Sequence, residues 1–389
     1  MDKKIIITAI LILFSITKFQ TSFSQNSQST NSGNDDFVIT EEFTNNINEI
    51  KPDWLSCFNE GLAIVKKDEK YGFIDKSGKV VIPIQFSTAW DFSEGLACVQ
   101  KVGERKMGYI NKQGELVIPA IFDRSGFSRY NFHDGVARLL KDGMLTGVNK
   151  EGKILFSSDL STPRGWTEFS NGLLLVSTSK VYTSKNGRPY RIEKYGYINK
   201  NGKIAIPMDF DYADDFKEEW AITLKNGIWS FIDKNGNTVL TMNLSSNIKR
   251  VNNFSEGIAV FWENRTLKCG CIDKKGNVII PLQKYSLEEF HDGLIMAGLN
   301  GKNGFMDKKG RLVIPIKFDY AHSFYEGLAL VAKETDGDIH DYGFIDKNGN
   351  IVIPMKFDFA SDFNEGLAVV MKGDKYGYVD KHGNTTLSE

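Results

Sequence analysis

Short apolar runs alternate with charged and glycine-containing turns along most of the chain after residue 51. The run Gly366–Val370 (Gly-Leu-Ala-Val-Val) is closed by charged residues and is too short for a helix, so it predicts a buried strand. In Tyr71–Asp75 (Tyr-Gly-Phe-Ile-Asp), the two rings alternate with other side chains, which is the two-residue periodicity of a strand. A third run, Val80–Ile84, contains Pro83. Because proline cannot donate to a β-ladder, this run predicts an edge strand or a strand that ends there.

The three runs recur in the same order, with an Asp-Lys-x-Gly turn such as Asp75–Gly78 between the second and the third. An Asp or Asn side chain can bond its own backbone in such a turn, and the glycine accepts a positive φ. A phenylalanine opens the first run in nine copies, which define units 1 to 9: Phe58, Phe92, Phe132, Phe169, Phe216, Phe254, Phe290, Phe324 and Phe363. The second run carries a glycine at eight of nine aligned positions, 34 to 49 residues apart: Gly72, Gly108, Gly147, Gly196, Ser230, Gly270, Gly304, Gly343 and Gly377.

A period of this length is typical of a solenoid, propeller or array. A single unit cannot bury both faces of its aromatic residues, whereas neighbouring units can shield each other. We therefore expect an all-β tandem array of about nine three-stranded antiparallel units. An open or gently superhelical array is favoured, because nine units exceed the 4–8 blades usual for a propeller and the unit lengths vary; a closed β-propeller is the alternative.

The combined pattern of Phe-x-Glu-Gly-Leu-Ala, aromatic-Gly-aromatic-Ile-Asp-Lys-x-Gly and Val-Ile-Pro resembles the bacterial WG-repeat family over roughly residues 54–389. The tryptophan of the family name is usually replaced here, by Tyr71, Tyr195, Tyr342 and Tyr376, and Trp229 is followed by Ser230. The resemblance implies an all-β repeat module with no established chemistry.

The amino terminus predicts export. Lys3 and Lys4 precede an apolar run, and Ser22-Phe-Ser24 supplies the pattern that a signal peptidase cleaves, so residues 1–24 are expected to be a signal peptide. The apolar run is shorter than the ~20 residues that span a bilayer, so no membrane span is expected after cleavage. Residues 25–51 are polar and predict a flexible leader, which leaves 52–389 as the repeat domain. The mature protein is expected in the periplasm, at the cell surface or outside the cell.

Composition narrows the partners. Among 389 residues, 48 Lys and Arg balance 49 Asp and Glu, which gives no electrostatic reason to expect nucleic acid or an anionic membrane. Export permits disulfides, but only four cysteines occur. Cys269 and Cys271 share one face of a predicted strand at a separation unfavourable for bridging, while Cys57 and Cys98 are either bridged or free buried thiols.

Enzyme motifs are absent from the sequence: it has no nucleophile elbow, zinc-protease helix, phosphate loop or dinucleotide fingerprint. The five histidines lie in different units, and His133 and His291 fill a slot that Ser or Asn fills elsewhere, which predicts surface positions. Carboxylates recur in two rows, one directly before the glycine of the first run and one at the start of the Asp-Lys-x-Gly turn. Because the members of each row are equivalent, they favour turn formation and strand-end bonding over catalysis. Asp336–Asp341 carries three carboxylates but lacks the spacing of a calcium loop. We expect no enzyme activity, cofactor or metal.

The irregular units are where binding specificity is expected. An insertion in unit 4, Lys180–Lys194, carries five positive charges against one Glu, and Asn186-Gly187 predicts a hairpin turn. Its candidate contact residues are Tyr182, Arg188, Tyr190 and Arg191, although a functionless surface hairpin fits the sequence equally well. The predicted function is a non-catalytic scaffold that binds a protein at the cell envelope. The alternative is a glycan or cell-wall binding module that uses the repeated tryptophans Trp54, Trp90, Trp166, Trp220 and Trp262.

Overall fold

The computed structural model describes residues 37–124, 130–164, 167–184, 186–242, 247–264, 266, 268–335 and 339–387. The signal peptide expected at 1–24 and the first part of the expected leader, up to residue 36, lie outside the described residues. Residues 35–389 form one compact unit.

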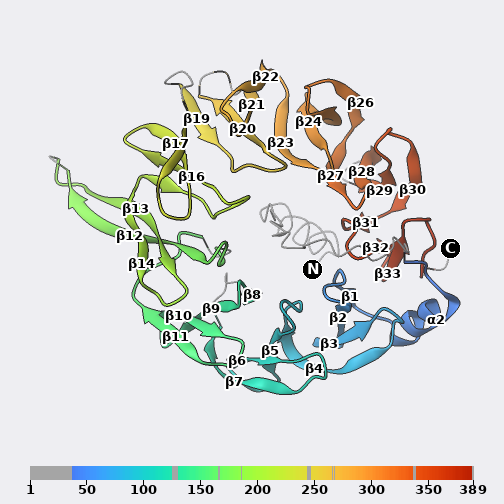
Figure 1. Ribbon diagram of the computed structural model, residues 1–389. Coiled ribbons are helices and arrows are strands. Elements are labelled where there is room, and N and C mark those ends of the chain that lie inside the picture. Colours follow the sequence, from blue (N-terminus) through green and yellow to red (C-terminus); the bar gives the residue numbers. More distant parts are fainter. Residues whose placement is uncertain are drawn as a thin grey trace. The chain divides into compact units, whose positions relative to one another are not determined.

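Antiparallel sheets make up the repeat domain, and their strands follow one another along the chain (Figure 1). The first sheet contains units 1 to 3 and has eleven strands: β1 (Trp54–Leu55), β2 (Leu62–Lys67), β3 (Lys70–Asp75), β4 (Val80–Ala89), β5 (Ala97–Lys101), β6 (Lys106–Ile110), β7 (Leu116–Asp123), β8 (Phe132–His133), β9 (Val136–Lys141), β10 (Met144–Asn149) and β11 (Ile154–Ser158). Unit 4 is the three-stranded sheet of β12 (Leu173–Thr183), β13 (Pro189–Asn199) and β14 (Ile204–Phe210).

Units 5 to 8 are four-stranded sheets. Their strands are β15 (Tyr212–Ala213), β16 (Ala221–Lys225), β17 (Ile228–Ile232) and β18 (Thr238–Thr241); β19 (Ile248–Val251), β20 (Ile258–Glu263), β21 (Cys269–Asp273) and β22 (Val278–Gln283); β23 (Ser286–His291), β24 (Leu294–Leu299), β25 (Lys302–Asp307) and β26 (Leu312–Phe318); β27 (Tyr320–Tyr325), β28 (Leu328–Thr335), β29 (Ile339–Ile345) and β30 (Ile351–Phe357). Unit 9 has β31 (Phe359–Ala360), β32 (Leu367–Lys372) and β33 (Lys375–Asp380). The all-β prediction is confirmed, but units 5 to 8 have four strands and not the expected three.

The glycine of the second run is required by a close backbone approach. The register between β3 and β4 shifts between Tyr71 and Phe73, the two residues that flank Gly72, and again between Phe73 and Ile74. A Cβ at position 72 would lie 2.7 Å from the Ile82 carbonyl oxygen and 2.8 Å from the Ile84 Cα, so only glycine fits. Pro83 lies in β4, which neither ends there nor forms the edge of the sheet as expected, because it continues to Ala89 and pairs with β5. The pairing with β5 begins only at Phe86, so the missing N–H of Pro83 interrupts no bond to that strand.

The hydrophobic core lies between neighbouring units. In seven of the nine junctions, counted over the described residues, the ring that follows the second-run position packs on the opening phenylalanine of the next unit. Phe73 and Phe92 are one such pair, with ring centroids 5.0 Å apart. Where the first ring is a tyrosine, its hydroxyl donates to a backbone carbonyl of the next unit, as Tyr109 does to Tyr130 at 2.6 Å and Tyr197 does to Asp214 at 2.7 Å. Each unit therefore covers apolar surface that its neighbour cannot bury alone.

Unit 9 packs on unit 1 in the same way. The Tyr378 ring lies 5.2 Å from the Phe58 ring, and its hydroxyl donates to the Ser56 carbonyl at 2.8 Å. The Asn364 side chain donates to the Phe58 carbonyl at 2.6 Å. The order of contacts is therefore cyclic, and the favoured expectation of an open array is wrong. Contacts between the first and the last unit are those of the closed alternative. In an open array Phe58 and Tyr378 would lie at the two ends and face water, whereas both are 0% exposed.

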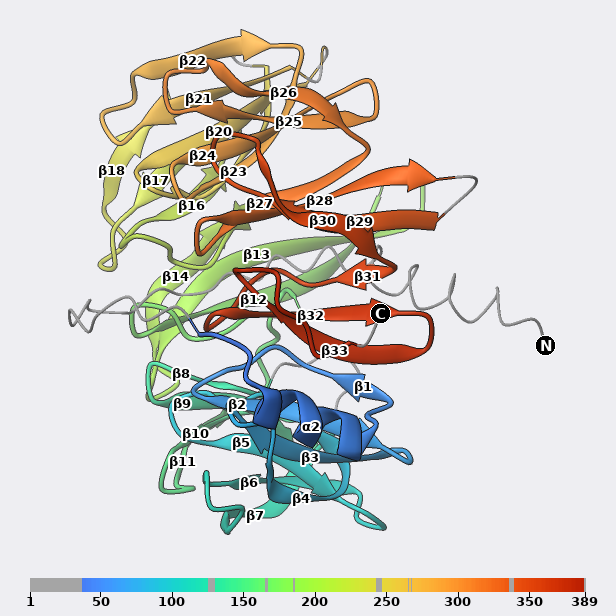
Figure 2. The same cartoon turned by 90° about the vertical axis from the view of Figure 1, so that its right-hand side faces the viewer.

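A helix covers this closing junction. Helix α2 (Glu41–Ile50) begins at Thr40, whose hydroxyl accepts a hydrogen bond from the Phe43 N–H, and its buried residues Phe43 and Ile47 belong to the core formed by units 9 and 1. Figure 2 shows α2 beside β1, β2 and β3. The expectation of a flexible leader is therefore wrong for residues 41–50, because this amphipathic segment buries its apolar face. Within the described residues, no helix is both long and apolar enough to cross a membrane.

Candidate interaction surface

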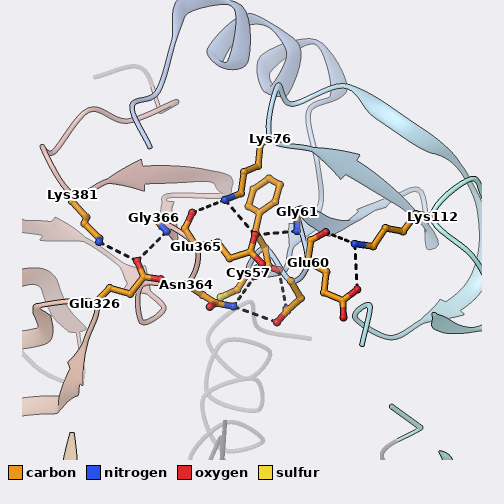
Figure 3. Close-up of polar contacts among 12 residues, drawn as sticks. Cys57, Glu60, Gly61, Lys76, Lys112, Glu326, Asn364, Glu365, Gly366 and Lys381 are labelled. Atoms are coloured by element: carbon orange, nitrogen blue, oxygen red, sulfur yellow. Dashed lines mark hydrogen bonds and ion pairs between the residues drawn. The ribbon is translucent and has the colours of Figure 1, made fainter. Parts of the chain in front are cut away.

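The turn that carries Phe-x-Glu-Gly, here called the acidic turn, lies within each unit. It contacts the acidic turn of the neighbouring unit. At the closing junction the Glu365 carboxylate accepts a hydrogen bond from the Gly61 N–H at 3.0 Å and lies 3.3 Å from the Lys76 ammonium (Figure 3). Lys76 also donates to the Glu365 carbonyl at 2.9 Å. We call this arrangement a clasp. It links the carboxylate of one unit to the acidic-turn glycine of the following unit and, at several junctions, to a lysine from the following unit's Asp-Lys-x-Gly turn.

The clasp recurs at eight of the nine junctions among the described residues. The carboxylate and glycine pairs are Glu60 with Gly95, Glu94 with Gly135, Asp134 with Gly172, Glu218 with Gly257, Glu256 with Gly293, Asp292 with Gly327, Glu326 with Gly366 and Glu365 with Gly61. The exception is the junction of units 4 and 5, where Asn171 and Glu219 occupy the two positions. There Arg164 contacts Asp214 at 2.6 Å and Tyr212 at 2.7 Å, which supplies another charged link between these units.

The clasp explains why glutamate occupies an unfavourable backbone position. Glu60 has φ 52° and Glu365 has φ 52°, in the left-handed region that side chains other than Gly, Asn and Asp rarely adopt. The strain costs ~1–2 kcal/mol, and a hydrogen bond to a charged group contributes ~1.5–3 kcal/mol, so the clasp offsets it. The first row of carboxylates therefore bonds the next unit, which the strand-end interpretation missed.

The second row of carboxylates forms turns, as predicted. Asp75 Oδ1 accepts hydrogen bonds from the backbone N–H of Ser77 at 2.8 Å and Lys79 at 3.2 Å. The same pair of bonds forms at Asp233, Asp273, Asp307, Asp346 and Asp380. Both rows of repeated carboxylates thus have structural partners.

A third row of polar residues, which the repeat pattern did not predict, lies at the junctions. The residue before each opening phenylalanine lies at a junction, and the row reads Cys57, Asp91, Asn131, Glu168, Asp215, Asn253, Glu289, Ser323 and Asp362. Several of these residues bond the neighbouring unit: His133 lies 2.9 Å from Glu168, and His322 lies 2.6 Å from Asp362. The recurrence of a polar residue at this position in every unit is the sequence signal that could have identified the row.

One buried charge distinguishes unit 3. Arg138, 5% exposed, occupies a strand position that is apolar in the other eight units, such as Ile64 and Leu175. Its guanidinium donates to the Thr162 hydroxyl at 3.1 Å. Burial lowers the pKa of Arg138, and nearby Glu168 and Asp215 oppose that shift. Burial and the adjacent Asp214 raise the pKa of Asp215 well above its ordinary value. The junctions of units 3 to 5 therefore contain the buried charged groups Arg138 and Asp215, beside the irregular hairpin of unit 4.

Asp91 gives the fold a pH dependence that can be measured. Burial raises its pKa to about 6, although hydrogen bonds from Ser56 and Asn59 oppose the shift. Between about pH 4 and 6 the unfolded chain loses this proton and the folded chain keeps it, so the contribution of Asp91 to stability falls as the pH rises. A shift of about two pKa units corresponds to at most about 3 kcal/mol.

Asp91→Asn should remove this dependence, because asparagine can still accept the Ser56 hydroxyl at 3.1 Å but cannot ionise. Urea unfolding at intervals from pH 4 to 8 should show the variant gaining stability over the wild type as the pH rises, with a plateau above pH 7. Parallel curves for the two proteins would show that the Asp91 pKa is unperturbed.

The insertion of unit 4 forms the predicted hairpin. Strands β12 and β13 pair from Leu173 and Asn199 out to Thr183 and Pro189, while β14 pairs with β13 only from Tyr195 inward. Residues 178–183 and 189–194 therefore form a two-stranded extension, which Figure 1 shows reaching past the other strands.

The four candidate contact residues lie at different places on the extension. Tyr182 and Tyr190 are direct cross-strand partners, 43% and 48% exposed, and their rings stack with centroids 5.8 Å apart. Arg191 pairs with Val181 on the opposite face, because successive side chains of a strand alternate. Arg188 is exposed beside the turn, where its N–H donates to the Ser184 hydroxyl. The structure thus brings the two tyrosines together, places Arg191 on the opposite face and leaves Arg188 beside the turn.

The remaining candidates have structural contacts. Trp54, Trp90, Trp220 and Trp262 pack against inter-unit cores, and Trp166 lies outside the described residues. His133 and His291 are not on open surface as expected, because His133 bonds Glu168 and the His291 ring lies 5.0 Å from that of Tyr325.

Neither a bridged cysteine pair nor a metal site is found in the described part of the chain. All four cysteines are free thiols, so the Cys57–Cys98 bridge is not formed. The described residues contain no group of three His, Cys, Asp or Glu side chains that could hold a metal. The acidic segment Asp336–Asp341 lies partly outside those residues.

Comparison with known proteins supports the repeat assignment. The pattern of the WG-containing-repeat family matches residues 53–71, 71–103, 107–144, 195–227, 229–261, 270–302, 304–334 and 342–376. No curated protein sequence matches the chain. A solved structure of a eukaryotic initiation factor superposes with a TM-score of 0.52 at 14% identity, over 82% of this chain and 88% of that one. At this identity the likeness concerns the fold alone.

Two other solved structures are less alike. BamB from Moraxella catarrhalis has a TM-score of 0.40 at 9% identity, over 72% of this chain and 94% of that one. Dipeptidyl peptidase 4 from Porphyromonas gingivalis has a TM-score of 0.48 at 10% identity, over 80% of this chain and 60% of that one. Neither likeness is high enough to suggest a shared function. The family pattern, in contrast, covers well over half of the residues, and the chain belongs to the WG-containing-repeat family.

Proposed function

We propose that this protein is an exported, non-catalytic scaffold, built as a closed β-propeller of nine units, that binds a partner protein at the cell envelope through the hairpin 180–194. The observation that carries the proposal is the stacked, exposed pair of Tyr182 and Tyr190 on a two-stranded extension. Val181 and Ile192 on the same extension are 64% and 39% exposed. Tyrosine and arginine are among the residue types that carry most binding energy at protein interfaces.

Charge indicates an acidic partner surface. The hairpin has five basic residues and one glutamate. Lys194 is paired with Asp211 at 2.6 Å, whereas Lys180, Arg188 and Arg191 are exposed. Exposed charges of one sign speed association with an oppositely charged surface and make binding sensitive to salt. We therefore expect the affinity to fall as ionic strength rises.

Packing favours a protein over a glycan as the ligand. A stacking platform for sugars needs exposed rings in a row, but the tryptophans proposed for it pack against the inter-unit cores. A catalytic role gains little support from the repeated carboxylates, because the acidic turns and the Asp turns use them for clasps and backbone bonds.

The proposal is tested by the double variant Tyr182→Ser/Tyr190→Ser in the full chain. Partners captured from cell-envelope extract by the wild type should bind the double variant at least tenfold more weakly, because two hot-spot rings are removed. Val102→Ser is the matched control: Val102 is 56% exposed on a different turn, and its loss should leave binding unchanged. A glycan array run in parallel tests the alternative.

Unfolding curves that match the wild type would show that the double variant is intact. Undiminished capture by an intact double variant, or retention of a glycan that does not depend on the hairpin, would contradict the proposed function.

A further inference from the structure

The backbone of the hairpin leaves one edge open. Ser177 on β12 donates its N–H away from β13, to the Ser161 carbonyl at 2.7 Å. In an antiparallel strand every second residue directs its N–H and C=O to the same side. Ser179, Val181 and Thr183 therefore present these groups to the side opposite β13, and all three residues are exposed. Ser161 forms an isolated antiparallel bridge with Ser177 on this side of β12, and an added strand would extend that pairing toward Thr183.

The other edge of the hairpin lacks one of its outward N–H groups. The Asn199 N–H donates away from β12, to the Lys203 carbonyl, so Glu193, Arg191 and Pro189 also direct their backbone away from β12. Pro189 has no N–H to offer there. The edge strands β14, β22, β26 and β30 likewise carry a proline, the protection that edge strands commonly have: Pro207, Pro281, Pro315 and Pro354. The exposed part of β12 carries none.

From this geometry, and resting on the proposed function, we infer that the partner binds as an extended acidic peptide segment that adds a strand to β12 along Ser179–Thr183. Main-chain hydrogen bonds supply the affinity of such strand addition, and side chains on alternate positions supply the specificity. On one face the added strand meets Tyr182 and Lys180, and on the other it meets Val181. The excess of basic residues in the hairpin selects an acidic segment.

The inference is tested by removing a single outward N–H. Val181→Pro deletes the central donor of the β12 edge, and the hairpin keeps its internal bonds because this N–H points away from β13. Val181→Ala is the side-chain control. Arg191 lies directly opposite Val181, so Arg191→Pro compared with Arg191→Ala tests the other edge in the same way.

Two probes are used: a fluorescent octapeptide of four Glu-Val repeats and its Lys-Val counterpart, titrated by fluorescence polarisation. We expect Val181→Pro to weaken binding of the Glu-Val peptide at least tenfold and Val181→Ala less than threefold. Arg191→Pro should bind like Arg191→Ala, and the Lys-Val peptide should not bind. Hydrogen exchange with the Glu-Val peptide bound should slow at the amides of Ser179, Val181 and Thr183, and stay unchanged at Arg191 and Glu193.

The outcomes separate this inference from the proposed function. If Tyr182→Ser/Tyr190→Ser abolishes capture of the protein partner while Val181→Pro binds both the peptide and the partner like Val181→Ala, the hairpin is the binding site and strand addition is wrong. Slowed exchange on the Arg191 edge would overturn the assignment to β12. Undiminished capture by the double variant overturns the proposed function itself.

Discussion

Replacing Tyr378 with alanine should lower the free energy of unfolding by about 3–5 kcal/mol, the usual cost of deleting a buried aromatic ring. The ring is 0% exposed and packs on Phe58 and on Phe43 of α2, and its hydroxyl bonds the Ser56 carbonyl. The effect depends on closure, because Phe58 and Phe43 reach Tyr378 only when unit 9 meets unit 1. In an open array Tyr378 would lie at a free end, and its loss would cost little.

Two variants calibrate the measurement by urea unfolding. Tyr378→Phe keeps the ring and loses only the hydroxyl bond, so it should cost about 1 kcal/mol. Tyr197→Ala removes the equivalent ring at an internal junction, where it packs on Phe216 with centroids 5.0 Å apart. Equal losses for Tyr197→Ala and Tyr378→Ala would agree with a closed ring of contacts, and a loss below about 1 kcal/mol for Tyr378→Ala alone would contradict it.

The second large effect is expected at Gly304. A Cβ there would lie 2.5 Å from the Ile314 carbonyl oxygen and 2.8 Å from the Ile316 nitrogen. Both are backbone atoms of β26, which cannot move aside without breaking its pairing with β25. Gly304→Ala should therefore cost about 3 kcal/mol, at the upper end of the range for overpacked sites.

Gly301 in the same unit is the control for Gly304. It has φ 75°, and no atom lies within 4 Å of the place that an alanine methyl group would take, so alanine there suffers only backbone strain. Gly301→Ala should cost about 1–2 kcal/mol by urea unfolding. If Gly304→Ala costs no more than Gly301→Ala, the close approach of β26 is not what requires glycine in the second run.

Helix α2 and the unusual position of Arg138 could both have been predicted from the sequence. Thr40 followed by Glu41, Glu42 and Phe43 is the start signal of a helix, and Phe43 and Ile47 are spaced to share one face. The polar composition around them favoured a flexible leader instead. Arg138 is charged in a slot that is apolar in eight units, which only the alignment of units reveals. In both cases the signal was a few residues that differ from the pattern around them: a helix start within a polar segment, and one charged residue at a repeat position that is otherwise apolar.

Local chemistry along the chain is enough to predict the strands, the Asp-Lys-x-Gly turns, the repeat and the hairpin of unit 4, because periodicity, proline, glycine and Asx bonding act over a few residues. The folded arrangement was needed to show that the acidic-turn carboxylates bond the next unit and that unit 9 meets unit 1. Glu60 bonds Gly95 across 35 residues, and Asn364 bonds Phe58 across 306. Closure depends on the rotation between successive units accumulated over the whole chain, and no single unit encodes that sum.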